Sequence, residues 1–164
     1  VYKRQAYTDR ELDYFIEDSE PTLFVGKDIR SDVFSLTLDE HGKGSLIESM
    51  DDASDVPDVV DLKGSDLASI LYTSGTTGRS KGAMLTHGNL HSNAVALTDC
   101  WGWRKDDVLL HALPIFHVHG LFIASHCALL SGTPMIFLPK FEVNQVFERL
   151  PDCTVLMGVP TFYT

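Results

Sequence analysis

A short segment rich in glycine and hydroxyl side chains, residues 73–82, is the part of the sequence whose residue types could do chemistry. Its glycines, Gly75, Gly78 and Gly82, let the backbone turn so that successive N–H groups point at one anion. Hydroxyl side chains can donate further hydrogen bonds, and Lys81 supplies a positive charge suited to phosphate. The hydroxyl residues are Thr73, Ser74, Thr76, Thr77 and Ser80. The segment therefore predicts a phosphate-binding loop and not an ordinary turn.

The spacing within this segment differs from that of the Walker A loop. That motif needs a glycine directly before its lysine and a hydroxyl residue directly after it. Here Ser80 precedes Lys81, and Gly82 follows it. The sequence therefore argues against the P-loop NTPase class.

Histidines form the second group of candidate functional side chains. On a strand, the spacing of two between His117 and His119 would place both on one face, and with His126 they could bind a metal. No cysteine or acidic residue nearby completes a zinc site, so we favour a role without metal. His87 and His91 lie four residues apart on a predicted helix but lack the glutamate of His-Glu-x-x-His. We interpret this pair as polar residues at a helix start.

Composition and charge narrow the class of protein. The chain has 164 residues, 44% hydrophobic and 22% charged, which is typical of a globular domain. No apolar run approaches the roughly 18 residues that a membrane span needs. The formal net charge of −10 argues against nucleic acid as a partner. Residues 1–66 carry 7 Lys and Arg against 17 Asp and Glu, whereas residues 67–164 carry 6 of each. The predicted phosphate loop therefore lies in the half without acidic excess.

The cysteines indicate the redox state of the compartment in which the protein works, and the first residues bear on where the natural chain starts. Cys100, Cys127 and Cys153 are widely spaced, which predicts neither disulfides nor a zinc site, and we interpret them as buried small hydrophobes in a reducing compartment. We expect a cytoplasmic protein, with the mitochondrial matrix as an open alternative. The chain starts at Val1 without a methionine, so we expect its natural start to be missing and treat residues 1–5 as a candidate non-native leader.

The elements around the loop alternate between strand and helix. The apolar run 67–72 predicts a strand that leads into the loop, and 83–85 predicts a short strand after it. Thr86 can cap a helix over 87–100. Further along, the pattern predicts strands over 108–113, 135–138 and 155–159, a helix buried all round over 120–130, and a helix over 143–150. This alternation predicts an α/β layered fold with a largely parallel sheet.

The first third of the chain is less regular. Thr8 and Glu11 have the spacing of a capping box, which predicts a helix over 8–20. A short strand is predicted over 22–25, and residues 39–66 are interpreted as an exposed, variable, acidic connection.

The loop and its neighbours resemble the adenylate-forming superfamily of acyl-CoA synthetases, luciferases and peptide-synthetase adenylation domains. The run from Thr73 to Gly82 is similar to the signature loop of that superfamily. Leu113–His117 with Gly120 and Leu121, and Val159–Thr161, resemble its later core motifs. The resemblance covers about residue 6 to the end and is weakest through 27–63. It implies that residues 6–164 are part of the large N-terminal, AMP-binding domain.

Within the superfamily, the chain resembles malonyl-CoA synthetases most. The supporting runs are Leu110–Ile115, His117–Phe122, Met135–Phe141 and Val155–Tyr163. Acyl-CoA synthetases that activate general fatty acids usually have an apolar residue at the position that corresponds to His119. A polar group there would suit a short diacid, malonate or methylmalonate, better than an alkyl chain.

The resemblance implies two half-reactions. A carboxylate attacks the α-phosphorus of ATP to give an acyl-adenylate and pyrophosphate, and the thiol of CoA then attacks the acyl carbon and AMP leaves. It implies Mg²⁺ with the ATP, and CoA as co-substrate. It further implies His117 as a catalytic residue beside the reacting carboxylate, and His117, His119 and Gly120 as contacts to the acyl substrate. The implied contacts to the ATP phosphates are Thr73, Ser74, Gly75, Thr76, Thr77, Gly78, Arg79, Ser80 and Lys81, of which Arg79 and Ser80 vary within the superfamily.

Two alternatives stay open. One is another adenylate-forming enzyme, such as a medium-chain acyl-CoA synthetase or an adenylation domain. The other is a non-catalytic nucleotide-binding module that has kept the loop. We find no segments for adenine, ribose or the catalytic lysine of the superfamily, so we expect the 164-residue chain alone to lack ligase activity.

Overall fold

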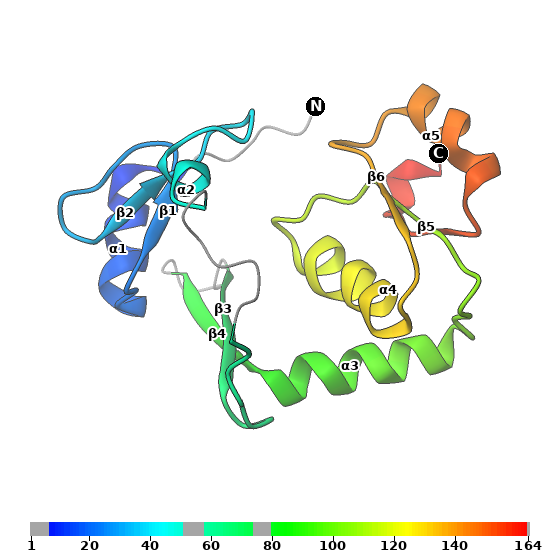
Figure 1. Cartoon of the computed structure of the whole chain (residues 1–164), viewed down its shortest axis with the longest axis horizontal. Helices are drawn as coiled ribbons and strands as arrows, with labels where there is room; N and C mark the ends of the chain where they lie inside the picture. Colours follow the sequence, from blue (N-terminus) through cyan, green and yellow to red (C-terminus); the bar gives the residue numbers. More distant parts are fainter. Residues whose placement is uncertain (1–6, 51–57, 74–79, 164) are drawn as a thin grey trace. The chain divides into compact units, whose positions relative to one another are not determined.

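The computed structural model describes residues 7–50, 58–73 and 80–163 (Figure 1). The chain divides into two compact units, Val1–Val60 and Asp61–Thr164, and each is considered by itself. The boundary falls inside the acidic segment 39–66.

The first unit contains a helix, a short parallel pair of strands and a single helical turn. These elements are α1 (Asp9–Ser19), β1 (Phe24–Gly26), β2 (Ser35–Thr37) and α2 (Ser45–Glu48). The predicted capping box is confirmed: the Glu11 N–H donates to Thr8 Oγ1 at 3.4 Å, and the Thr8 N–H donates to Glu11 Oε2 at 2.8 Å.

Part of this unit differs from the prediction. β1 begins at Phe24 and not at residue 22, while β2 and α2 were not predicted, although α2 lies inside the segment 39–66. Side-chain hydrogen bonds join the end of β2 to the start of α2: the Thr37 N–H donates to Ser45 Oγ at 2.9 Å, and the Ser45 N–H donates to Thr37 Oγ1 at 3.0 Å. Hydrophobic periodicity does not reveal such contacts.

In the second unit, two antiparallel strands flank the glycine-rich loop. β3 (Leu67–Thr73) and β4 (Lys81–Thr86) pair so that Thr73 lies opposite Lys81. Both strands were predicted, but β4 is longer than 83–85 and the pair is antiparallel. Gly82 allows this extension, because a Cβ atom there would come within 2.7 Å of the Ile70 side chain.

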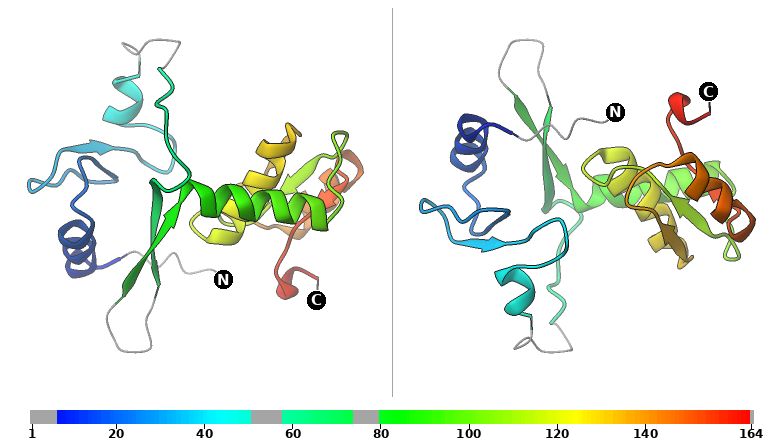
Figure 2. Two further views of the ribbon diagram at one scale, coloured as in Figure 1. Left: turned by 90° about the horizontal axis from the view of Figure 1, so that it is seen from below. Right: turned by 90° about the horizontal axis from the view of Figure 1, so that it is seen from above.

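A long helix follows the hairpin directly. α3 (His87–Cys100) begins at Thr86, as predicted, and runs from the end of β4 towards the sheet of this unit (Figure 2). Thr86 Oγ1 accepts a hydrogen bond from the Asn89 N–H at 3.1 Å, and Asn89 Oδ1 accepts one from the Thr86 N–H at 3.0 Å. Ala94 is buried in the middle of the helix.

A three-stranded parallel sheet carries the core of this unit. Its strands β5 (Leu109–His111), β6 (Met135–Phe137) and β7 (Val155–Leu156) lie in the order β6-β5-β7, with β5 in the centre. Leu109 and Leu113 pack with Ala124 and Ala128 on one face of the sheet. Leu110 and Ala112 pack on the other face against Val146 of α5 (Val143–Arg149). The predicted α/β class with parallel strands is confirmed.

The helical segment after β5 differs from the prediction in its burial. It consists of a π-helical turn, η1 (His119–Ala124), and α4 (Ser125–Ser131). Its small residues face inward, whereas Leu121, Leu129 and Leu130 are exposed. Close packing against the sheet admits only small side chains, so the prediction of a helix buried all round is wrong for the large ones.

In the described part of the second unit, the chain turns through 3₁₀ segments at Leu150–Asp152 and Pro160–Phe162. Cys127 is buried as predicted, but Cys153 is only half-buried and Cys100 is exposed. Among the described residues, no helix has the length and apolar character that crossing a membrane requires.

Asp107 links the starts of two strands of the sheet. Its carboxylate accepts hydrogen bonds from the Arg104 N–H at 2.7 Å and from the Thr154 hydroxyl at 2.8 Å. Thr154 Oγ1 in turn accepts one from the Val108 N–H at 2.9 Å. The hydrogen bond from the Arg104 backbone N–H lowers the pKa of the Asp107 carboxyl, and the hydrogen bond from the Thr154 hydroxyl lowers it further by a smaller amount.

We expect Thr86→Ala to destabilise the second unit by about 1 kcal/mol, because the hydrogen bond from the Asn89 N–H to the Thr86 hydroxyl oxygen at the helix N-terminus is lost. Denaturant unfolding of the chain measures this change. Ser92→Ala, on the exposed surface of α3, is the control and should leave the midpoint nearly unchanged. Equal midpoints for Thr86→Ala and the wild type would contradict the capping role.

We expect Asp107→Asn to reduce the dependence of stability on pH. Because the folded pKa is depressed, the carboxylate contributes in full above its ordinary pKa of about 3.9, and the contribution is lost as pH falls through the folded value. Melting curves between about pH 6 and about pH 3 should therefore show a larger loss for the wild type than for Asp107→Asn. Asp106→Asn, at the exposed neighbour, should follow the wild type. Parallel curves for all three proteins would argue against this contribution of Asp107.

Candidate functional site

The β3–β4 pairing brings the two ends of the predicted phosphate loop together. Thr73 and Lys81 lie directly opposite each other, and both are exposed. Directly opposed residues of an antiparallel pair share one face of the ribbon. A hydroxyl donor and a cation therefore lie side by side where the loop begins and ends. Ser80 is half-buried. The remaining predicted phosphate contacts lie outside the described residues: Ser74, Gly75, Thr76, Thr77, Gly78 and Arg79.

His117 lies in an exposed turn after β5. Its N–H donates to the Pro114 carbonyl at 3.3 Å, and its own carbonyl accepts from the Leu121 N–H at 2.9 Å. Its ring lies 4.6 Å from that of Phe116. Because this segment is a turn, the strand spacing considered for a metal pair does not apply. In the described part of the chain, no three His, Cys, Asp or Glu side chains form a group that could bind a metal.

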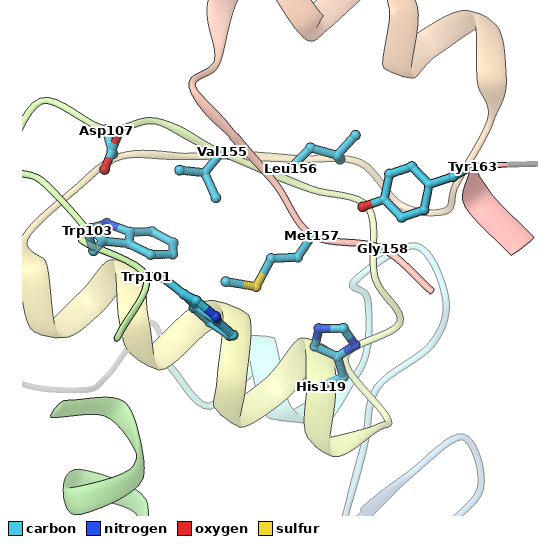
Figure 3. A pocket seen from close by; sticks show the side chains of 9 residues that line it. All are labelled: Trp101, Trp103, Asp107, His119, Val155, Leu156, Met157, Gly158 and Tyr163. Carbon is cyan, nitrogen blue, oxygen red and sulfur yellow. The ribbon is translucent and has the colours of Figure 1, made fainter. Parts of the chain in front are cut away.

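His119 lines a cavity of about 430 Å³ in the second unit, and its imidazole points into it (Figure 3). Apolar side chains from β7 and the residues after it form one wall of the cavity. The other lining residues come from the end of α3, the segment before β5 and the last 3₁₀ turn. The full lining is Trp101, Trp103, Asp107, His119, Val155, Leu156, Met157, Gly158 and Tyr163.

The polar groups of this cavity differ in what they offer a ligand. Asp107 is negative and already accepts two hydrogen bonds, so its end of the cavity disfavours an anion. Trp103 donates its indole N–H to Thr133 Oγ1 at 3.2 Å. His119 and the Tyr163 hydroxyl lie at the other end (Figure 3). An acid bound here would place its carboxylate at the end formed by His119 and Tyr163, and its carbon atoms along the apolar wall.

Gly120 has a clear packing role and does not line the cavity. A Cβ atom at this position would lie 2.4 Å from the Pro114 carbonyl oxygen. The Gly120 carbonyl accepts hydrogen bonds from the buried His111 and from Ser125. Sequence reasoning missed His111, because a histidine within an apolar strand gives no motif signal. The contact of Gly120 to an acyl substrate stays a prediction.

The remaining histidines are not gathered into one site. His126 is half-buried in α4, where burial lowers its pKa, and its ring meets Phe122 edge-on at 5.2 Å. His87 and His91 are both exposed on the first two turns of α3, as expected for polar residues at a helix start.

Known proteins resemble this chain over nearly its whole length. It is 34% identical to mitochondrial malonate–CoA ligase of Xenopus laevis, a match covering 98% of this chain and 30% of that protein. The crystal structure of ATP-bound MatB from Rhodopseudomonas palustris matches with 49% identity and a TM-score of 0.89, covering 98% of this chain and 34% of MatB. A malonyl-CoA ligase in a product complex with methylmalonyl-CoA and AMP matches with 33% identity and a TM-score of 0.75, covering 94% of this chain and 33% of that one.

The chain therefore spans about a third of the length of these relatives. The family model of AMP-binding enzymes matches residues 1–164. This match shows that the chain belongs to the family of AMP-binding enzymes.

Proposed function

We propose that this chain is part of an ATP-dependent acid–CoA ligase that activates malonate or methylmalonate as an acyl-adenylate and transfers the acyl group to CoA. The observation that carries this proposal is the similarity of the chain to malonate–CoA ligases along nearly its whole length. The position of His119 on a cavity of about 430 Å³, where its imidazole could meet a carboxylate, also supports it.

The loop between β3 and β4 would bind the ATP phosphates. Thr73 and Lys81 are opposite each other in the hairpin, which supports a role in which the Lys81 ammonium and the Thr73 hydroxyl would approach the same phosphate from one face of the ribbon. The other loop residues would add backbone N–H and hydroxyl donors, while Mg²⁺, when bound with ATP, would neutralise further phosphate charge. The role of the loop in adenylate formation is therefore positioning and charge neutralisation.

The cavity would bind the acid. A dicarboxylic acid has one carboxylate that reacts with ATP and a second that must be held away from it. His119 and Tyr163 supply hydrogen-bond donors for the second carboxylate, at the end of the cavity opposite Asp107 (Figure 3). His117, in the neighbouring turn, would lie near the reacting carboxylate.

A second candidate substrate is a larger apolar acid, as used by other adenylate-forming enzymes. The observation in its favour is the apolar wall of the same cavity, formed by Val155, Leu156 and Met157. The two candidates differ in the need for a donor at position 119, because an alkyl chain gains nothing from an imidazole there.

The metabolic setting follows from the substrate. A ligase that makes malonyl-CoA or methylmalonyl-CoA would supply acyl groups for fatty acid metabolism. Among the described residues, the three thiols are free, which suits the cytoplasm or the mitochondrial matrix.

We expect Lys81→Ala to weaken ATP binding roughly 10- to 100-fold, since a charge-assisted contact to phosphate is lost. Lys81→Arg should recover part of this loss, because it keeps the charge but changes the donor geometry. The affinity is measured by calorimetric titration with ATP and Mg²⁺ of the full-length protein that contains this chain. Lys105→Ala is the control and should bind like the wild type. Unchanged affinity in Lys81→Ala would leave the loop without its proposed role.

We expect His119→Leu to raise the KM for malonate about tenfold, because a donor to the distal carboxylate is lost. The same change should leave the KM for ATP within about twofold and improve the relative use of a medium-chain acid. These constants are obtained from the rate of AMP formation by the full-length protein that contains this chain, measured with malonate and with octanoate. His91→Leu on α3 is the matched control. Higher activity of the wild type with octanoate than with malonate would favour the second candidate.

A further inference from the structure

His111, at the end of the central strand β5, is a buried polar side chain that the proposed mechanism does not use. It is only 1% exposed. Its ring stacks on Phe137, its partner in the β5–β6 register, with 4.4 Å between ring centroids and 22° between ring planes. Its Nδ1 atom is buried without a hydrogen-bond partner. Burying such a group without a partner is costly, so the contacts of the other ring nitrogen must offset this cost.

The Nε2 atom of His111 contacts the Gly120 carbonyl oxygen at 2.9 Å. A carbonyl oxygen can only accept, so Nε2 must carry the proton of this hydrogen bond. The same oxygen accepts from the Ser125 hydroxyl at 2.8 Å and from the Ser125 backbone N–H. Three donors, from β5 and from the start of α4, therefore converge on one carbonyl group.

These donors determine the kind of helix that follows β5. In an α-helix, the Ser125 N–H would donate to the carbonyl four residues earlier, at Leu121. Here it donates to Gly120, five residues earlier, which is the hydrogen bond of a π-helical turn. The side chains of His111 and Ser125 stabilise the same carbonyl from outside the helix ladder. They thus favour the π register over the α register.

The register matters because His119 is the first residue of the π turn. The following residues cannot rotate, since Ala124, Cys127 and Ala128 are packed in the core. Loss of the extra residue of a π turn would therefore rotate the residues before it by about 100° about the helix axis. Such a rotation would move the His119 imidazole out of the cavity that it now lines.

We propose that His111 is a positioning residue that holds the π turn His119–Ala124 in register and thereby aims His119 at the bound acid. The part of this proposal that concerns the acid depends on the function proposed above. The part that concerns the turn does not.

The register of the turn is tested on the protein without any substrate. With ¹⁵N-labelled histidine, the imidazole shifts of His111 should report a proton on Nε2 and none on Nδ1. A coupling across the hydrogen bond should connect the Ser125 nitrogen with the Gly120 carbonyl carbon. A proton on Nδ1 alone, or a coupling from Ser125 to Leu121, would overturn the proposal.

Two substitutions separate the hydrogen bond from the packing of the ring. His111→Phe keeps an aromatic ring on Phe137 but has no donor, whereas His111→Gln keeps a donor near the place of Nε2 and loses the ring. In the full reading frame, His111→Phe should raise the KM for malonate about tenfold with the KM for ATP within about twofold. His111→Gln should stay within about threefold of the wild type for both substrates.

Ser125→Ala removes the second side-chain donor and disturbs the core less. It should raise the KM for malonate by a smaller factor. Both Ser125→Ala and His111→Phe should weaken the coupling between the Ser125 nitrogen and the Gly120 carbonyl carbon, because each removes a donor that favours the π register. Equal increases of both KM values in His111→Phe, together with a lower Tm, would show a merely structural role and overturn the proposal. If the wild type activates no acid, the proposed function fails, while the NMR data still confirm or overturn the role of His111 in the turn.

Discussion

The second unit depends on one strand that is paired on both sides. β5 lies between β6 and β7, and Leu109, Leu110 and His111 are almost completely buried. A central strand of a parallel sheet has both edges satisfied by backbone hydrogen bonds and both faces covered. Every element of the candidate acid site is therefore placed relative to β5: the turn with His117, the π turn with His119, and β7 with the apolar wall.

The two faces of β5 have different tasks because side chains alternate along a strand. Leu110 and Ala112 pack against Val146 on the face covered by α5. On the other face, Leu109 and Leu113 pack against α4, and His111 between them donates to Gly120. His111, a polar residue in the middle of an apolar pattern, thus connects the core to the helical turn that carries His119.

The ends of the proposed phosphate loop depend on a different constraint, the register of a hairpin. Thr73 and Lys81 are opposite each other because β4 extends through Gly82 along β3, where a larger residue would contact the Ile70 side chain. The capped start of α3 at Thr86 then ends β4 and leads the chain to the sheet. The proposed phosphate-binding and acid-binding residues thus lie on separate elements of one unit.

The sequence by itself determined the local features of this protein. The capping box at Thr8, the N-cap at Thr86, the strand before the glycine-rich loop and the alternation of strands and helices all depend on neighbours in the chain, so pattern and spacing revealed them. Only the tertiary structure decided the antiparallel pairing of β3 with β4, the pairing of Thr37 with Ser45, and the π turn held by His111. Each of these contacts joins residues distant in the chain, and its energy comes from burial and hydrogen bonds that no local pattern contains.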